Sequence, residues 1–592
     1  MTSGDVFRFP PPSKKRCRMF ASYWRVSYTY CSISPSFNVS RLPEINTKRI
    51  GVMIRSTTSH FSFLALLAAM ILVSGIGTDI VQAQSLRVGQ PFRVYPSNVM
   101  QTETFVVRHP LNSNILFASA STINLGSGFT SEGIYVSTNA GQTWRGNDTC
   151  TGAPISFHRG DPAIAIDKNG TFLLTRYGFP GPPTGIYFHS STDLGLTWSS
   201  QRTITSQDAD RASLVSDIIP ASSFYGRSYA AWVRLSSPYP VYYSYTDDGG
   251  ANWSAPAQVN SPSPRSQGAE LSIGPNGRTS LCWARVVNIS PYIEDFVGFA
   301  TSTDGGANWS ISENAFDVNG IQGTFPQKGN IRVNGLPKID TDNTGGPRHG
   351  WIYIVTTQRN LLPAGSDPDI ILNRSSNNGH TWSGGIRVNQ DPLNNGKTQF
   401  FPAIHIDDGG GINVIYYDDR DTTPDSTGVY LSRSTDGGDT WSDHPIGTQR
   451  FKPSFVALNL ADNIGMTSVG TTLWPIWMDN SSGIYQMWAC PIDLVALNVD
   501  ESALPSAFEL LQNFPNPFNP TTQISFRLAE GGDVTLRIYD VLGREVSTLV
   551  DERLQAGNHS RAFDAYGLGG GVYFYRLQSG QHSQTMKMLL LK

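Results

Sequence analysis

The chain has 592 residues, of which 15% are charged and 11% aromatic, with 57 glycines and 37 prolines. This composition favours short strands and tight turns over long helices. Residues 1–83 hold 10 of the 44 Lys and Arg and 3 of the 47 Asp and Glu, which leaves 34 basic and 44 acidic residues after them. A net charge near −10 on the remaining chain disfavours nucleic acid and anionic membranes as partners.

The first 83 residues have the pattern of a targeting sequence. The apolar run HFSFLALLAAMILVSGIG (His60–Gly77) lies between a basic residue and a group of small residues, the order found in secretory signal peptides. We therefore assign residues 53–83 to a signal peptide that starts at Met53 and treat residues 1–52 as a misassigned upstream extension. The alternatives are a genuine long extension and a retained membrane anchor, for which the run is near the lower length limit.

Three of the five cysteines follow this region: Cys150, Cys282 and Cys490. An odd and sparse set predicts no disulfide framework. Cys282 and Cys490 fall in apolar stretches, and we expect both in the core.

A polar, glycine-rich phrase that ends in tryptophan occurs six times between residues 84 and 497. The copies are STNAGQTW (Ser137–Trp144), STDLGLTW (Ser191–Trp198), TDDGGANW (Thr246–Trp253), STDGGANW (Ser302–Trp309), SSNNGHTW (Ser375–Trp382) and STDGGDTW (Ser434–Trp441). Their starts are separated by 54, 55, 56, 73 and 59 residues. Such regular spacing predicts a repeat architecture.

Each position of the phrase suits a hairpin turn. The leading Ser or Thr and the Asp or Asn two places later can accept hydrogen bonds from nearby backbone amides. The glycine supplies a positive φ angle, and the tryptophan buries its ring between neighbouring strands. We therefore predict a structural and not a catalytic role for Ser137, Trp144, Asp193, Trp198, Asp248, Trp253, Asp304, Trp309, Asn377, Trp382, Asp436 and Trp441.

The phrase resembles the Asp-box of the sialidase-like propellers that contain BNR repeats. The resemblance implies an all-β ring of four-stranded blades over residues 84–497, with each box between the third and fourth strands. Counting boxes gives six blades, whereas counting strand modules gives seven, which we favour. The module Ile464–Ile492 has no box, and we expect the N-terminal segment Ser85–Pro96 to supply its missing outer strand.

The last eighty residues have a different pattern. After a predicted linker over residues 498–512, alternation such as Val534, Leu536 and Ile538 indicates half-buried strands. We therefore predict a small Ig-like sandwich over residues 513–592.

This tail resembles the type A C-terminal sorting domain of the type IX secretion system of Bacteroidota. The matching residues are Asn513–Pro520 (NFPNPFNP), Tyr539, Asp540, Gly543, Arg544, Ala556, Gly557, Gly571–Tyr573 and Lys587. The resemblance implies the type IX machinery as a partner, and a mature chain without a membrane anchor, either outside the cell or on the surface of a Gram-negative bacterium. The alternative is an ordinary accessory Ig-like domain.

We expect a ligand site at the end of the ring opposite the boxes, where second strands end and first strands begin. The candidate ligand-binding residues there are Arg176, Arg234, Arg285, Asp418, Asp479, Glu103 and Asp161. The three arginines predict a cationic side suited to an anionic sugar or carboxylate, facing an acidic side. The alternative is that these charges pair with one another or are hydrated at the rim.

The resemblance to sialidases does not assign catalytic residues. That family uses three arginines, a Tyr–Glu nucleophile pair and an Asp acid/base, and its first arginine lies in a Phe-Arg-Ile-Pro stretch. The nearest string here, FRVYP (Phe92–Pro96), falls in the predicted closing strand, and no spacing selects Tyr416, Tyr417 or Glu270. The sequence therefore predicts an exported propeller that binds or hydrolyses extracellular glycans, or a non-catalytic adhesion module.

No metal or cofactor motif occurs after residue 83, and we predict no cofactor. The segment YDDRDTTPDSTG (Tyr417–Gly428) has enough carboxylates for calcium but lacks the spacing of a known calcium loop. Calcium binding there is the alternative to a solvated loop.

Overall fold

The computed structural model describes residues 86–591 except 128, 151–159, 179–184, 211, 455–462, 495–507 and 514. The predicted upstream extension and signal peptide lie outside the described residues, as does most of the predicted linker. Secondary structure in the described part consists of strands and two short 3₁₀ helices, which confirms the all-β prediction. None of its helices has the length and apolar character needed to cross a membrane.

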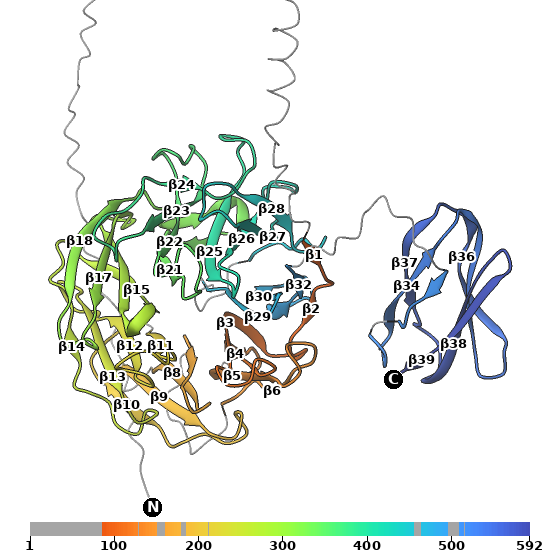
Figure 1. Cartoon of the computed structure of the whole chain (residues 1–592), viewed down its shortest axis with the longest axis horizontal. Helices are drawn as coiled ribbons and strands as arrows, with labels where there is room; N and C mark the ends of the chain where they lie inside the picture. The colour runs from red at the N-terminus through yellow and green to blue at the C-terminus, as the bar shows by residue number, and fades with distance from the viewer. Residues whose placement is uncertain are drawn as a thin grey trace, which may run out of the picture. The chain divides into compact units, whose positions relative to one another are not determined.

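Six four-stranded sheets and one six-stranded sheet follow one another around a central axis (Figure 1). The first strands are β3 (Met100–Arg108), β7 (Ala163–Ile166), β11 (Ser213–Ser216), β15 (Ser266–Ile273), β21 (Lys338–Thr341), β25 (Gln399–Ile406) and β29 (Gly465–Val469). The second strands are β4 (Leu116–Asn124), β8 (Phe172–Gly178), β12 (Ser228–Val233), β16 (Thr279–Val286), β22 (Ile352–Gln358), β26 (Ile412–Asp418) and β30 (Thr472–Asp479).

The third and outer strands complete these sheets. The third strands are β5 (Phe129–Ser137), β9 (Gly185–Ser191), β13 (Val241–Thr246), β17 (Glu294–Ser302), β23 (Asp369–Ser375), β27 (Gly428–Ser434) and β31 (Gln486–Ala489). The outer strands are β6 (Arg145–Asn147), β10 (Arg202–Thr205), β14 (Ala257–Gln258), β18 (Ser310–Asp317), β24 (Ile386–Arg387), β28 (Ser442–Pro445) and, in the last sheet, β2 (Phe92–Arg93).

The start of the chain completes the last sheet. Strand β2 pairs with β31, and β1 (Arg87–Val88) pairs with β32 (Ile492–Asp493), which also pairs with β30. Each first strand contacts the first strand of the next sheet, and β29 contacts β3. The ring is therefore closed, which removes free sheet edges, and the predicted N-terminal outer strand is present.

The antiparallel strands place successive turns alternately at the two ends of the ring. In the first sheet Arg108 pairs with Leu116, and Leu116 pairs with Ser137, so the first turn and the box lie at the same end. The same register recurs in the other sheets that contain a box. We refer to this end of the ring as the box end and to the other as the opposite end.

Each box closes a turn and joins its sheet to the preceding one. In the fourth box, Ser302 Oγ accepts the Gly306 N–H at 2.8 Å, and Asp304 accepts the backbone N–H four residues later at 2.9 Å. The Trp309 ring packs edge-on against Tyr243 of the preceding sheet, with centroids 5.2 Å apart. Equivalent ring contacts are made by Trp198, Trp253 and Trp382. Trp198 is buried and the other five box tryptophans are half-buried.

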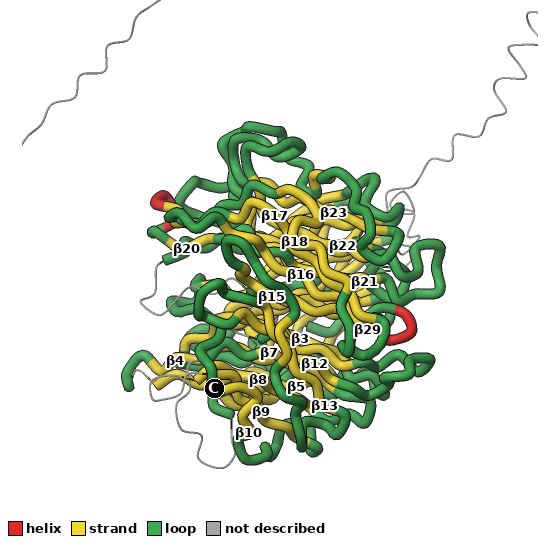
Figure 2. Tube along the Cα trace, turned by 90° about the vertical axis from the view of Figure 1, so that its left-hand side faces the viewer, coloured by secondary structure: helices red, strands yellow, loops and turns green. Residues whose placement is uncertain are grey.

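The longest interval between boxes contains an insertion after the fourth sheet. It consists of β19 (Gly323–Phe325), the 3₁₀ helix η2 (Pro326–Lys328) and β20 (Ile331–Val333). Figure 2 shows the two helical turns on opposite sides of the ring, with η2 beside β20 and η1 (Pro275–Gly277), which belongs to a turn at the box end, on the other side. The insertion therefore lies at the opposite end.

The insertion packs into the core of the ring. Its apolar side chains join the cluster formed by the sixth and seventh sheets, and the Phe325 ring lies edge-on to Phe400 at 5.7 Å. Lys328 is fully buried and donates to Asp419 at 2.7 Å and to two backbone carbonyls. The opposite end of the ring is therefore partly covered by this hairpin.

The C-terminal residues form a sandwich of two antiparallel sheets with their own core, as predicted. One sheet contains β33 (Glu509–Leu510), β34 (Thr521–Leu528) and β37 (Gly557–Asp564), and the other contains β36 (Glu545–Leu554), β35 (Gly532–Tyr539), β38 (Gly571–Ser579) and β39 (His582–Leu590). The sandwich begins earlier than predicted. Strand β33 lies inside the predicted linker 498–512. Its Leu510 side chain is buried in the core of the sandwich, which ties this strand to the C-terminal domain.

Candidate functional site

The seven predicted ligand-binding residues lie at the opposite end of the ring, near the ends of second strands and the starts of first strands. Two of the three arginines are held inside their own sheets. Arg176 is fully buried, donates to Gln201 and lies 5.2 Å from the Tyr187 ring, and burial lowers the pKa of its guanidinium. Arg285 makes a bidentate pair with Asp295 at 3.0 and 2.5 Å.

Arg234 differs from the other two arginines. It is half-buried, and its Nη1 donates to the Tyr242 hydroxyl at 3.3 Å. Within the described part of the chain, no carboxylate lies within ion-pair distance of it. Its guanidinium charge is therefore the least compensated of the three.

The two acidic candidates at second-strand ends are buried. Arg420 donates to Asp418 at 2.8 Å, and burial nevertheless raises the pKa of that carboxyl to about 6. Asp479 accepts hydrogen bonds from Gln449 and from the indole of Trp477, and burial raises its pKa as well. Both carboxyl groups are thus part of the packing of their strand ends.

Of the remaining candidates, Glu103 lies in the first half of β3 and Asp161 lies just before β7, and both have left-handed backbone, at φ of 53° and 51°. Glu103 accepts a hydrogen bond from Asn463, and Asn463 also binds Lys338 Nζ at 2.5 Å. Lys338 in turn donates to Glu270 at 2.6 Å. This chain of polar contacts joins β3, β15 and β21 to the segment that precedes β29, so Glu103 and Glu270 have a structural role there.

The Tyr and Glu residues considered as nucleophile parts, Tyr416, Tyr417 and Glu270, do not meet at an open site. Tyr417 is buried and donates to the Met478 carbonyl at 2.7 Å, and Tyr416 is hydrogen-bonded to Ser432 at 2.7 Å. Burial raises the pKa of both hydroxyls well above its usual value. Arg93 of the FRVYP string lies in the outer strand β2 and is exposed.

The acidic segment that follows β26 is neutralised by the protein's own cations. The pairs are Asp418 with Arg420, Asp419 with Lys328, Asp421 with Arg450 and Asp425 with Lys452. Across the described ranges, no group of three or more His, Cys, Asp and Glu is arranged to hold a metal ion.

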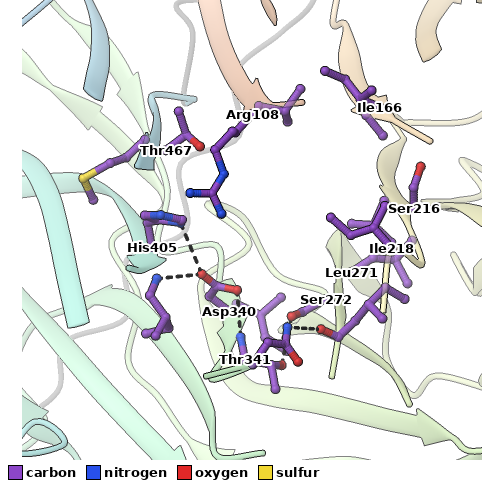
Figure 3. A pocket seen from close by; sticks show the side chains of 18 of the residues that line it. Arg108, Ile166, Ser216, Ile218, Leu271, Ser272, Asp340, Thr341, His405 and Thr467 are labelled. Carbon is purple, nitrogen blue, oxygen red and sulfur yellow. Dashed lines mark hydrogen bonds and ion pairs between the residues drawn. The ribbon is translucent and has the colours of Figure 1, made fainter. Parts of the chain in front are cut away.

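A cavity of about 600 Å³ opens at the box end, where the sequence analysis predicted no site (Figure 3). Residues at or near the ends of all seven first strands line it. One part of the wall comes from the second to fourth sheets and is mainly aliphatic, although Ser216 and Ser272 also lie on this side (Figure 3). Its apolar side chains are Ile164, Ile166, Leu214, Ile218, Leu271 and Ile273. The facing part is polar and contains Arg108, Asp340, His405, Asp408 and Thr467.

Asp340 and His405 face each other across two first strands. The Asp340 carboxylate accepts the backbone N–H groups of Thr341 and Ile406, each at 2.8 Å, and its Oδ2 lies 3.7 Å from His405 Nδ1. Burial raises the pKa of Asp340 to about 7 and lowers the pKa of His405 to about 4. The imidazole is therefore neutral at physiological pH and does not balance the carboxylate charge.

Arg108 contributes no net charge to this wall. Its Nη1 and Nη2 donate to the two oxygens of Asp408 at 2.6 and 2.9 Å, and Nη1 also donates to the Ser468 carbonyl at 3.0 Å. Among the described residues, Asp340 has no Lys or Arg within ion-pair distance. A signal for this site was present in the sequence, because the titratable residues Asp340 and His405 stand near the ends of first strands, in the strings KIDT and AIHI.

Comparison with protein families assigns both parts of the chain. Residues 103–310 match the BNR repeat-like domain, and residues 512–591 match the secretion system C-terminal sorting domain. The chain therefore carries a BNR repeat-like domain within its propeller and a secretion system sorting domain at its C-terminal end. The sorting domain directs this BNR propeller to the exterior or the surface of the cell.

Several solved structures are similar to the BNR propeller. A PL25 ulvan lyase shares 12% identity over 68% of this chain and 95% of its own, with a TM-score of 0.45. A leech intramolecular trans-sialidase shares 13% identity over 56% of this chain and 67% of its own, with a TM-score of 0.36. An α-L-arabinanase of Penicillium chrysogenum shares 14% identity over 59% of this chain and 98% of its own, with a TM-score of 0.37. No curated protein matches the chain significantly.

Proposed function

We propose that the protein is an exported propeller that binds an extracellular ligand in its box-end cavity and does not cleave sialosides. The observation that carries this proposal is the cavity itself, which combines an aliphatic wall with Asp340 and His405 at a depth where burial shifts the pKa of both. Such a concave and largely preformed site is the usual form of a small-molecule site.

The opposite end of the ring supports the non-catalytic part of the proposal. Arg176 and Arg285 are held by partners in their own sheets, and Tyr416 and Tyr417 are buried. A sialidase-type reaction requires three guanidinium groups and a nucleophile that reach the same substrate, and these side chains do not provide them.

The test has an enzymatic arm and a binding arm. We expect no release of 4-methylumbelliferone from its sialoside or from a panel of neutral glycosides. In a thermal-shift screen of small molecules, we expect stabilising ligands whose effect is lost in Ile218→Asn, because this cavity residue is 38% exposed and replaceable without loss of the core. Sialoside cleavage, or hits that are all insensitive to Ile218→Asn, would contradict the proposal.

Glycan binding at the opposite end is a second candidate function, and Arg234 is the observation that favours it. Its guanidinium has no carboxylate partner among the described residues, and guanidinium groups bind carboxylates of acidic sugars in a fixed geometry. A glycan array probed with the wild type, Arg234→Ala and Arg285→Ala tests this function. We expect acidic-glycan signals to fall in Arg234→Ala and to persist in Arg285→Ala, because Arg285 is already paired with Asp295. Equal signals in all three proteins would reject a glycan site at Arg234.

A further inference from the structure

We propose that the box-end cavity binds a small molecule with an aliphatic body and a single primary ammonium head, such as an alkylamine. The inference rests on the proposed function and names the chemical class of its ligand. It follows from the separation of the aliphatic and polar parts of the cavity wall and from the unpaired carboxylate in the polar part.

The aliphatic part of the wall favours methylene groups. In Figure 3 the side chains of Ile166, Ile218 and Leu271 face the interior from one side, where Ser216 and Ser272 are the labelled polar residues and carry no charge. An aliphatic chain buried there is released from water, which is favourable in proportion to the apolar area removed. Among the described residues that line the cavity there is no Phe, Tyr or Trp, so the aromatic cage that quaternary ammonium ligands use is absent.

The polar part of the wall has one carboxylate more than it has cations. Arg108 is paired with Asp408, and Asp407 is paired with Arg433. Asp340 accepts two backbone N–H groups, which position its oxygens, and has no basic side chain other than the neutral His405 within ion-pair distance in the described chain. An ammonium group at this position would supply the missing positive charge and form charge-assisted hydrogen bonds.

The carboxyl pKa predicts how binding depends on pH. Asp340 shares the cavity wall with His405 of β25, with Asp407 and Asp408 of the turn after it, and with Arg108 of β3. The nearby charge of Asp342 adds to the effect of burial on the pKa of Asp340. With a pKa of about 7 in the empty cavity, Asp340 is about half protonated at pH 7. Because the ammonium requires the carboxylate, binding should tighten between pH 6 and 8 and release about half a proton per ligand at pH 7.

Isothermal titration calorimetry on the exported protein tests the ligand class directly. The probes are n-hexylamine, n-hexanol, n-hexanoate and 1,6-diaminohexane. We expect hexylamine to bind more tightly than the neutral alcohol and the anion by about tenfold or more. The diamine should bind more weakly than hexylamine, because its second ammonium would lie against the aliphatic wall. Titrations in two buffers of different ionisation enthalpy measure the released proton.

Two variants and two matched controls locate the binding. Asp340→Asn should lower the affinity for hexylamine by about tenfold or more and abolish its pH dependence, while the affinity for hexanol stays the same. Ile218→Asn should lower the affinities for hexylamine and hexanol alike. The controls Asp317→Asn and Ile289→Asn change exposed residues that do not line the cavity and should leave all affinities unchanged.

The outcomes separate this inference from the function on which it rests. Hexanol or hexanoate binding as tightly as hexylamine, or hexylamine binding that is unaffected by Asp340→Asn, would overturn the ammonium assignment and leave the cavity as a ligand site. Failure of every probe also overturns the ammonium assignment. The proposed function itself fails on separate results, which are sialoside cleavage or a wider screen in which no ligand is sensitive to Ile218→Asn. Should Asp340→Asn fold poorly, the pH dependence and the proton release of the wild type decide the outcome.

Discussion

At the scale of single residues, burial acts on Asp340 and His405 in opposite directions. Desolvation disfavours the charged form of each group, so the pKa of the carboxyl rises to about 7 and the pKa of the imidazole falls to about 4. The two groups therefore make opposite contributions to the pH dependence of folding.

Asp340 predicts a loss of stability as the pH rises. Its pKa in the folded protein is above the value of about 3.9 expected for the unfolded chain. The folded state therefore binds more protons, and the Asp340 contribution is present below about pH 4 and lost as the pH rises through about 7. His405 acts in the reverse sense, with stability lost as the pH falls from about 6.5 to about 4.

Asp340→Asn isolates the first contribution. The quantity to compare is the free energy of unfolding of the variant minus that of the wild type. This difference should be about 2 kcal/mol higher at pH 8 than at pH 5. Urea unfolding at both pH values measures it. An identical pH dependence of stability in the two proteins would show that folding does not shift the pKa of Asp340.

At the scale of elements, the boxes and the insertion are the features that hold sheets together. The sequence predicted the turn chemistry of the boxes, because their hydrogen bonds join residues only two to four positions apart. It did not predict which residue each box packs against. Phe188 and Tyr243 are contacted by boxes of the next sheet, more than fifty residues later in the chain. The contact between Lys328 and Asp419 joins residues 91 positions apart, so it was not predictable from local sequence either.

Gly250 tests the packing of a box on its neighbour. It has φ of +84°, and an added Cβ would lie 2.0 Å from the Phe188 ring. Gly250→Ala should lower the free energy of unfolding by more than about 1 kcal/mol. Gly345→Ala is the control, because that Cβ would meet nothing within 4 Å. The two urea midpoints are compared with that of the wild type, and equal midpoints would contradict the close approach.

Lys328 tests the anchor of the insertion. Burial lowers the pKa of its ammonium, and Asp419 opposes that shift. Lys328→Met leaves the Asp419 carboxylate buried without its cation and should cost about 3 kcal/mol. Lys452→Met, which removes an exposed partner of Asp425, should cost less than about 1 kcal/mol. Similar losses in the two variants, measured by urea unfolding, would show that the insertion is not anchored by this pair.

At the scale of the whole molecule, the ring is closed by residues from the two ends of the propeller sequence. Strand β2 completes the last sheet by pairing with β31. Deletion of residues 86–96 should therefore leave that sheet with a free edge, lower the melting temperature and broaden the unfolding transition. Differential scanning calorimetry measures this effect. An unchanged, single sharp transition would show that the closure does not stabilise the ring.

The fold was predictable from the sequence to a larger extent than the site. The boxes, the strand modules and the tail are local patterns, and each was recognised without knowledge of its neighbours. The cavity wall is built from strand ends as distant as Arg108 and Thr467. Only ring closure brings these residues together. Residue type and strand register predict a shared position for the charged residues at the opposite end, but they do not reveal the partners of Arg176 and Arg285, which are Gln201 and Asp295.

The central claim is that ligand binds at the box end of the ring. Hydrogen–deuterium exchange of the exported protein, with and without a ligand found in the screen, tests it most directly. We predict slower exchange in residues 339–341 and 405–408, which line the cavity, and unchanged exchange around Arg176, Arg234 and Arg285. Protection confined to the segments around these three arginines would contradict the account.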